Sequence, residues 1–280
     1  MRSILVTVDD TPSAISARAL AVALARQCGA RVKGVTAVDV SDLEGVEAVP
    51  IGGGQAGHER YRRRQEQAKV RRARISQLPA LFERSLAQSG MEQAACTTIE
   101  GDIRSGLLRI IETCDLVVTG RDADFHLEPL EGVTPVVDHI IAEGCRPVVV
   151  CGPEWNERGP VVVAYDGSAP SAKALQVATL MGVFGSADVR VLSVGREGAA
   201  AAAAVERART FLDAYGVATE GEVIESTEHP ADLLARRASE LGARLLVMGA
   251  FGHRGFREIL FGSTTRRLFD SVPVPLFIHH

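Results

Sequence analysis

The sequence contains the same pattern of apolar runs and helical segments twice along its length. The first copy opens with an apolar run over residues 3–8, then aspartate, then a turn holding proline and serine, then an alanine-rich stretch. The second copy repeats that order from residue 160, and its turn is about two residues shorter when the two copies are compared. Each copy closes on another apolar run, at residues 146–151 and 272–280. Such self-similarity predicts two similar domains in place of one large one.

Within each copy, short runs of valine, isoleucine and leucine alternate with longer amphipathic segments. Runs such as residues 4–8 and 115–120 are apolar on both faces, which is typical of strands inside a parallel sheet. Segments such as residues 105–114 carry apolar side chains at helical spacing. Strands that alternate with helices imply parallel strands joined by right-handed crossovers. The sequence therefore predicts an α/β protein of two tandem, doubly wound, Rossmann-like domains, each with a five-stranded parallel sheet.

Glycine and proline at both ends of residues 152–160 predict a linker there. The expected domains are residues 1–152 and 158–280. After its second strand the first domain carries an insertion, in which residues 60–74 hold eight basic side chains. We interpret this segment as a solvated helix face; a surface for nucleic acid or for an acidic partner is the alternative.

Charge and composition exclude several classes of protein. The net charge of −4 gives no global attraction to nucleic acid, which makes nucleic acid an unlikely partner. No apolar run reaches membrane-spanning length, and the N-terminus enters a strand pattern without a signal peptide. The five cysteines are scattered, odd in number and free of CxxC spacing, which is typical of free thiols in a reducing compartment. We therefore expect a cytoplasmic protein with no membrane partner.

The stretch MGAFGHRGFREILFGSTTRRL, residues 248–268, follows the fourth strand of the second copy. Gly249 and Gly252 lack the β-carbon that would keep main-chain amides away from an anion. Gly262 and Ser263 stand where a helix begins and its first amides lack internal partners. The stretch holds four arginines and a single carboxylate. Residues alone leave two interpretations open, a phosphate cradle or a flexible connection between strand and helix.

The spacing Gly249-x2-Gly252-x9-Gly262-Ser263 resembles the ATP-binding signature of the universal stress protein family, G-x2-G-x9-G-(S/T). The resemblance covers nearly the whole chain as two tandem copies. It implies a fold similar to that of adenine nucleotide alpha hydrolases. It also implies a nucleotide-dependent stress-response or regulatory protein whose second domain binds ATP, ADP or AMP, with or without Mg²⁺.

The same resemblance assigns roles by position in the second domain. Asp166 would bind ribose, with the two preceding residues beside the adenosine, and the Val194 main chain would read adenine. The last two residues of the fourth strand would line the nucleotide, and the glycine-rich loop would hold the phosphates. The nucleotide-binding residues implied are Ala164, Tyr165, Asp166, Val194, Met248, Gly249, Gly252, His253, Gly262, Ser263 and Thr264. Open doubly wound sheets bind ligands where the strand order reverses, which independently puts Asp166 and this loop on one rim.

The first copy departs from this pattern. Gly120 matches Gly249, but no glycine follows three residues later, and the spacing from Gly120 to Gly132 is one residue shorter. The arginines are replaced by four carboxylates, at Asp122, Asp124, Glu128 and Glu131. Such a density of negative charge would repel a triphosphate. We predict that the first domain does not bind ATP in the family manner and either takes another ligand or serves as a scaffold for pairing.

Three classes of function remain open: a nucleotide-dependent regulator with an unknown protein partner, a slow ATPase, and a scaffold without nucleotide. The sequence has no P-loop lysine motif and no convincing set of catalytic residues, so we predict no catalytic residue and leave enzymatic activity uncertain, at most a weak ATPase. Members of the universal stress protein family, which this sequence resembles, commonly pair through their final strands. We therefore expect residues 146–151 and 272–280 to pair within one chain as an internal pseudo-dimer, and a further homodimer is an alternative.

Overall fold

The structure is a computed structural model. It describes residues 1–38, 59, 62–63, 66, 69–70, 73–91, 93–123, 125, 135–250 (main chain alone at 38, 135 and 138), 267–269 and 272–279. Among residues 60–74, those described are helical and exposed, in keeping with a solvated helix face. No helix in these ranges is long and apolar enough to cross a membrane.

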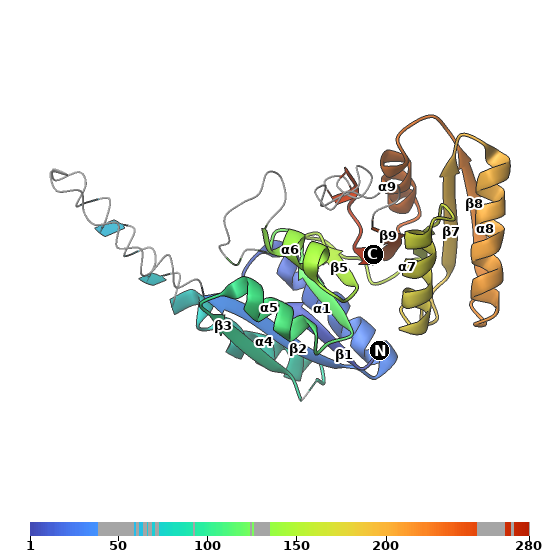
Figure 1. The fold of residues 1–280 in the computed structure, drawn as a ribbon. Coiled ribbons are helices and arrows are strands. Elements are labelled where there is room, and N and C mark those ends of the chain that lie inside the picture. Colours follow the sequence, from blue (N-terminus) through green and yellow to red (C-terminus); the bar gives the residue numbers. More distant parts are fainter. Residues whose placement is uncertain are drawn as a thin grey trace.

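Ten strands of the described ranges form one continuous sheet in the order β3-β2-β1-β4-β5-β10-β9-β6-β7-β8 (Figure 1). The first half contributes β1 (Ser3–Thr7), β2 (Arg31–Val38), β3 (Ala95–Glu100), β4 (Leu116–Gly120) and β5 (Val148–Cys151). The second half contributes β6 (Val161–Ala164), β7 (Val189–Gly195), β8 (Thr219–Glu225), β9 (Leu245–Gly249) and β10 (Leu276–His279). Each half is a five-stranded parallel sheet, as predicted.

The two halves meet where β5 pairs with β10. This pairing is antiparallel, with Leu276 opposite Val150 and Ile278 opposite Val148. The expected pairing of the final strands within one chain is therefore confirmed. Because the strands run in opposite directions across this junction, the carboxyl ends of the strands in the two halves lie at opposite edges of the sheet.

Helices cover both faces of the sheet, so the doubly wound prediction is confirmed. The core on one face lies under α1 (Pro12–Cys28), α4 (Leu78–Gln88), α7 (Ala169–Leu180) and α8 (Gly198–Asp213). The core on the other face lies under α5 (Ile103–Ile111), α6 (Pro135–Glu143) and α9 (Pro230–Glu240). Successive strand residues alternate between them: Val161 and Val163 face the first core, and Val162 faces the second. Each core contains residues of both halves, which packs the halves into one body.

The strand order reverses between β1 and β4 in the first half and between β6 and β9 in the second. Helix α1 begins three residues after Asp9, and α7 begins three residues after Asp166. The two turns therefore have equal length, and the two additional residues expected in the first turn are not present. The reason is that the extra aspartate, Asp10, occupies the place of Gly167 and does not lengthen the turn.

Candidate functional site

The second half brings Asp166 and Gly249 to the same edge of the sheet. Asp166 follows β6 and Gly249 ends β9, and these strands are paired neighbours with Val163 opposite Val247. Helix α7 begins at this edge, so its N-terminal amides and the positive end of its dipole lie beside Asp166. The switch-point argument from the sequence therefore holds for the residues described here.

The Asp166 carboxylate is held in place by the turn that follows it. The Ser168 N–H donates to Asp166 Oδ1 at 2.9 Å. Ser168 also caps α7, accepting at its Oγ from the Ser171 N–H at 3.4 Å. Burial favours the neutral acid, but hydrogen bonds from Ser168 and Ser171 outweigh it, so the pKa of Asp166 lies below its ordinary value. The site therefore presents a fixed, ionised acceptor.

Gly249 has a packing reason to be glycine. A β-carbon there would lie 2.5 Å from the Ser171 nitrogen, inside the first turn of α7. Gly120 occupies the same position in the first half, where a β-carbon would lie 3.0 Å from Ser13 Cβ at the start of α1. The first glycine of the signature is thus explained by helix packing in both halves, including the half that lacks the other glycines.

Three other predicted residues share one face of the sheet near this edge. Met248 is buried in the core beneath α9, and Ala164 and Val194 pack against the same core. Tyr165 differs, because its ring lies in the core beneath α7 and α8. Its main-chain N–H donates to Leu192 O at 2.9 Å, which extends the pairing of β6 with β7.

The remaining predicted residues, Gly252, His253, Gly262, Ser263 and Thr264, lie outside the described residues. The two ends of their segment are described. Ala250 N–H donates to His279 O at 2.9 Å, and Arg267 forms an ion pair with Asp232 of α9 at 2.8 Å. The segment therefore starts and ends next to β10 and the first turn of α9.

Sequence reasoning missed Arg207. Gly167 has a left-handed conformation, with φ of 78°, and the Arg207 guanidinium occupies the space into which a side chain at Gly167 would extend. Arg207 lies on α8, so it brings a cation to the rim beside Asp166. In the sequence, the Asp-Gly pair indicates a tight turn after the strand. Nothing in the sequence indicates which residue of α8 packs over that turn.

The equivalent rim of the first half is acidic. Asp9 Oδ1 accepts from the Thr11 N–H at 2.8 Å and from the Thr11 hydroxyl. Asp9 Oδ2 and Asp122 Oδ1 are buried and have no hydrogen-bond partner among the described residues. Burial raises the pKa of Asp9 to about 6, against the hydrogen bonds from Thr11 and with further repulsion from Asp122 and Asp10. This rim favours protonation over binding of an anion.

A cation from the insertion lies at that acidic rim. Arg74, the last of the basic residues, forms an ion pair with Asp10 directly after β1. Both side chains are substantially exposed, so the pair contributes little to stability. In the described part of the chain, no group of three His, Cys, Asp or Glu side chains is arranged to hold a metal ion.

A sequence model of the universal stress protein family matches residues 1–151 and 157–280. The chain belongs to the universal stress protein family. The two matches show its tandem arrangement.

Individual relatives agree with this assignment. The chain is similar to the universal stress protein Slr1230 of Synechocystis, with 23% identity over 285 residues and 99% of both chains covered. Its fold is similar to that of a universal stress protein from Archaeoglobus fulgidus, with a TM-score of 0.68, 17% identity, and 99% of this chain and 97% of the other covered. A putative universal stress protein from Pseudomonas aeruginosa gives a TM-score of 0.59 at 17% identity, with 99% and 92% covered.

Proposed function

We propose that this universal stress protein binds an adenine nucleotide in its second half, at the carboxyl ends of β6, β7 and β9, and acts as a nucleotide-dependent stress-response regulator. The observation that carries the proposal is the fixed, ionised Asp166 carboxylate at the point where the strand order reverses. A carboxylate in that place suits the hydroxyl groups of a ribose, which are hydrogen-bond donors.

The main chain of β7 offers a means of reading the base. Leu192 accepts from Tyr165 on the β6 side, and Gly195 accepts from Ser226 on the β8 side. Because main-chain groups alternate along a strand, Val194 directs its N–H and C=O toward the β6 side. The last residue of β6 that pairs with β7 is Ala164, which lies opposite Leu192. Val194 lies on β7 two residues beyond this last pair. Both groups are thus available to a planar base above Ala164.

The phosphates would be held by the glycine-rich segment between Ala250 and Arg267. The segment carries the signature residues Gly252, His253, Gly262, Ser263 and Thr264 and follows β9, whose carboxyl end is on the same rim as Asp166. Arg207 adds a positive charge there. Mg²⁺ would enter with the phosphates. The first half lacks the signature and presents Asp9 and Asp122 in the corresponding place, so we propose one nucleotide per chain.

The test compares the two halves of one protein. ATP, ADP and AMP are titrated into the purified full chain by calorimetry, with and without Mg²⁺, for the unchanged protein and for Asp166→Asn, Gly262→Val and Asp9→Asn. We expect Asp166→Asn to weaken binding roughly tenfold or more, the loss of one charge-assisted hydrogen bond. Gly262→Val should abolish binding, and Asp9→Asn should leave it unchanged.

Unchanged affinity in Asp166→Asn and Gly262→Val would show that the site is elsewhere. No binding to the unchanged protein, and no nucleotide in its acid extract, would favour a scaffold without nucleotide. Conversion of bound ATP to ADP during the titration, lost in Gly262→Val, would favour the slow ATPase.

A further inference from the structure

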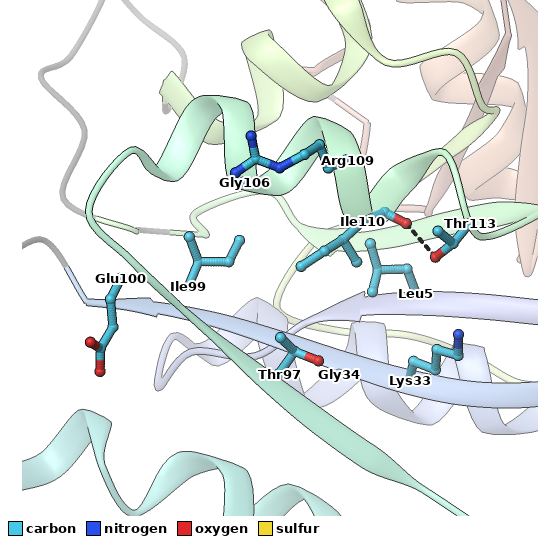
Figure 2. Close-up of a pocket in the computed structure, with 10 residues that line it drawn as sticks. All are labelled: Leu5, Lys33, Gly34, Thr97, Ile99, Glu100, Gly106, Arg109, Ile110 and Thr113. Atoms are coloured by element: carbon cyan, nitrogen blue, oxygen red, sulfur yellow. Dashed lines mark hydrogen bonds between the residues drawn. The ribbon is translucent and has the colours of Figure 1, made fainter.

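A hollow of about 410 Å³ lies between α5 and the edge of the first-half sheet (Figure 2). Its volume falls in the range of about 300–1,000 Å³ that is usual for small-molecule sites. Leu5, Ile99 and Ile110 supply its apolar surface. Figure 2 shows Arg109 on α5 and Lys33 on β2, with Leu5 and Ile110 between them. The hollow is on the α5 face of the sheet and not at the carboxyl rim, so it is separate from the proposed nucleotide site.

The second half shows what fills the corresponding place there. Along the rows of paired strands, Leu5, Lys33 and Ala95 of the first half correspond to Val162, Arg190 and Glu220 of the second. Two residues further along the edge strands, Thr97 corresponds to Glu222. The register makes this comparison independent of sequence alignment.

In the second half, every cation at this place has a carboxylate. Arg190 forms an ion pair with Glu220, and Arg237 of α9 forms one with Glu222 at 2.8 Å. The edge strand β8 thus supplies two negative charges to the basic residues of its neighbours.

In the first half one cation remains on β2, α5 brings an arginine from one position before the place of Arg237 when the helices are aligned at their N-caps, and both carboxylates are gone. Lys33 takes the place of Arg190, and α5 supplies Arg109, but the edge strand β3 has Ala95 and Thr97 in place of the two glutamates. Within the described part of the chain, neither the Lys33 nor the Arg109 side chain forms a hydrogen bond or an ion pair. The smaller side chains of β3 also explain why the place is hollow.

The neighbouring carboxylates do not replace the missing ones. Glu100 also lines the hollow, but it follows Ile99 on β3, so its side chain points to the opposite face. Figure 2 shows its carboxylate turned away from Lys33 and Arg109. Asp102 caps α5, accepting hydrogen bonds from the Ser105 N–H at 3.1 Å and the Ser105 hydroxyl at 2.5 Å, and it interacts with Arg109 through its charge without an ion-pair contact. Lys33 is only partly exposed, so its lack of a partner carries a desolvation cost that a bound anion would remove.

We propose that this hollow binds a small dicarboxylate with a hydrocarbon middle. One carboxylate lies at Lys33 and the other at Arg109, where the second half has Glu220 and Glu222, and the hydrocarbon covers Leu5, Ile99 and Ile110. The carboxyl end of α5 borders the hollow at Ile110 and Thr113, and its negative dipole end opposes an anion, a doubly charged phosphate more than the single charge of one carboxylate. Exposed ion pairs contribute little by themselves, so burial of the hydrocarbon supplies most of the affinity and the charges supply selectivity.

The test titrates suberate into the full-length protein and follows the methyl resonances of Leu5, Ile99 and Ile110 by NMR. Octanoate, 1,8-octanediol and sulfate are the comparison ligands. We expect saturable shifts at these methyl groups with suberate, and binding at least roughly tenfold weaker for octanoate and for the diol, each of which lacks a charge-assisted contact. Sulfate should leave the methyl resonances unchanged.

Two matched variants decide the role of the missing carboxylates. Ala95→Glu with Thr97→Glu restores the charges of the second half at exposed positions of an edge strand, and should weaken suberate binding at least roughly tenfold. Arg237 also pairs with Glu240 at 3.0 Å, so Glu220→Ala with Glu222→Thr and Glu240→Ala should create a second suberate site beneath α9. Lys33→Met should weaken binding in the same way, and Asp166→Asn should leave it unchanged. Failure of suberate to bind, equal binding by the diol, or unchanged binding in the Ala95→Glu/Thr97→Glu protein would overturn the proposal.

Discussion

Gly249 at the end of β9 lies directly against Ser171 in the first turn of α7, with room for no β-carbon between them. The same relationship joins Gly120 and Ser13 in the first half. The close approach of a strand end to a helix start is therefore a property of the fold, and it holds whether or not the half carries the rest of the nucleotide signature.

Alanine at either glycine should destabilise the protein in the absence of nucleotide. A β-carbon at Gly249 would meet main-chain atoms, which cannot move aside as a flexible side chain can, so we expect Gly249→Ala to lower the free energy of unfolding by about 1–3 kcal/mol. Gly120→Ala should lower the free energy of unfolding less, because the atom nearest to a β-carbon there, Ser13 Cβ, lies 3.0 Å away. Urea unfolding without nucleotide measures both. A Gly249→Ala protein of unchanged stability but weakened ATP binding would contradict the packing explanation.

Arg207 should contribute to nucleotide affinity without contributing to stability. Its guanidinium lies over Gly167, and its side chain is exposed. We expect Arg207→Ala to weaken ATP binding several-fold and AMP binding less, since the attraction grows with the charge of the phosphates. Calorimetric titration at two salt concentrations measures this, and the difference between ATP and AMP should shrink at high salt. Arg209→Ala, on the same helix and paired with Glu206, is the matched control and should change nothing.

Gly167→Ala tests the same contact from the other side. Alanine is strained at a φ of 78°, so we expect a loss of about 1–2 kcal/mol in the free energy of unfolding. The added methyl group would also displace the Arg207 guanidinium. If Arg207 acts at the site, Gly167→Ala and Arg207→Ala together should weaken ATP binding no more than the stronger single change. Additive losses would show that Arg207 acts independently of this contact.

The sequence was sufficient to predict the fold, because buried strands, amphipathic helices and a repeat are all local patterns. The pairing of β5 with β10 was expected from the family resemblance and not from a local pattern. The candidate site was predictable only in part. Asp166 followed from its place after a strand, but Arg207 depends on how α8 packs over a turn, which no local pattern encodes. The reason for Gly249 likewise depends on a helix far away in sequence. The unequal grooves beneath α5 and α9 required the register of the edge strands.

The pH dependence of stability should carry the signature of Asp9. Its pKa is about 6 in the folded protein against an ordinary value of 3.8, so the folded state binds more protons between these values. The free energy of unfolding should therefore fall as pH rises from about 4 to about 6, by at most about 3 kcal/mol, and Asp9 should add no further change above that. Asp9→Asn removes the buried charge and keeps an oxygen for Thr11, so it should stabilise the protein at pH 7 and flatten this slope.

Asp166→Asn is the matched control for Asp9, with the opposite sign. The pKa of Asp166 is lowered by its hydrogen bonds, so its contribution to stability is present above the unfolded pKa and is lost as pH falls through the folded pKa. Its asparagine variant should be less stable than the unchanged protein at pH 7. Urea unfolding at several pH values measures both variants. If Asp9→Asn instead lowers the free energy of unfolding at pH 7, the Asp9 carboxylate is ionised in the folded state and is stabilised there by its surroundings.

The continuous cores predict that the two halves unfold together. Phe277 of β10 is fully buried, pairs with Val149 of β5, and lies in a core that holds residues of both halves. Phe277→Ala should lower the free energy of unfolding by about 3–5 kcal/mol, as expected for a large core side chain. Trp155 is the only tryptophan, and its indole N–H donates to Arg244 O at 3.1 Å in the second half. Its fluorescence and the far-UV circular dichroism should therefore report a single coincident urea transition in the unchanged protein, and both should shift equally in the Phe277→Ala variant. Two separated transitions, with only the fluorescence moved by Phe277→Ala, would mean that the halves are independent units joined at one strand pair.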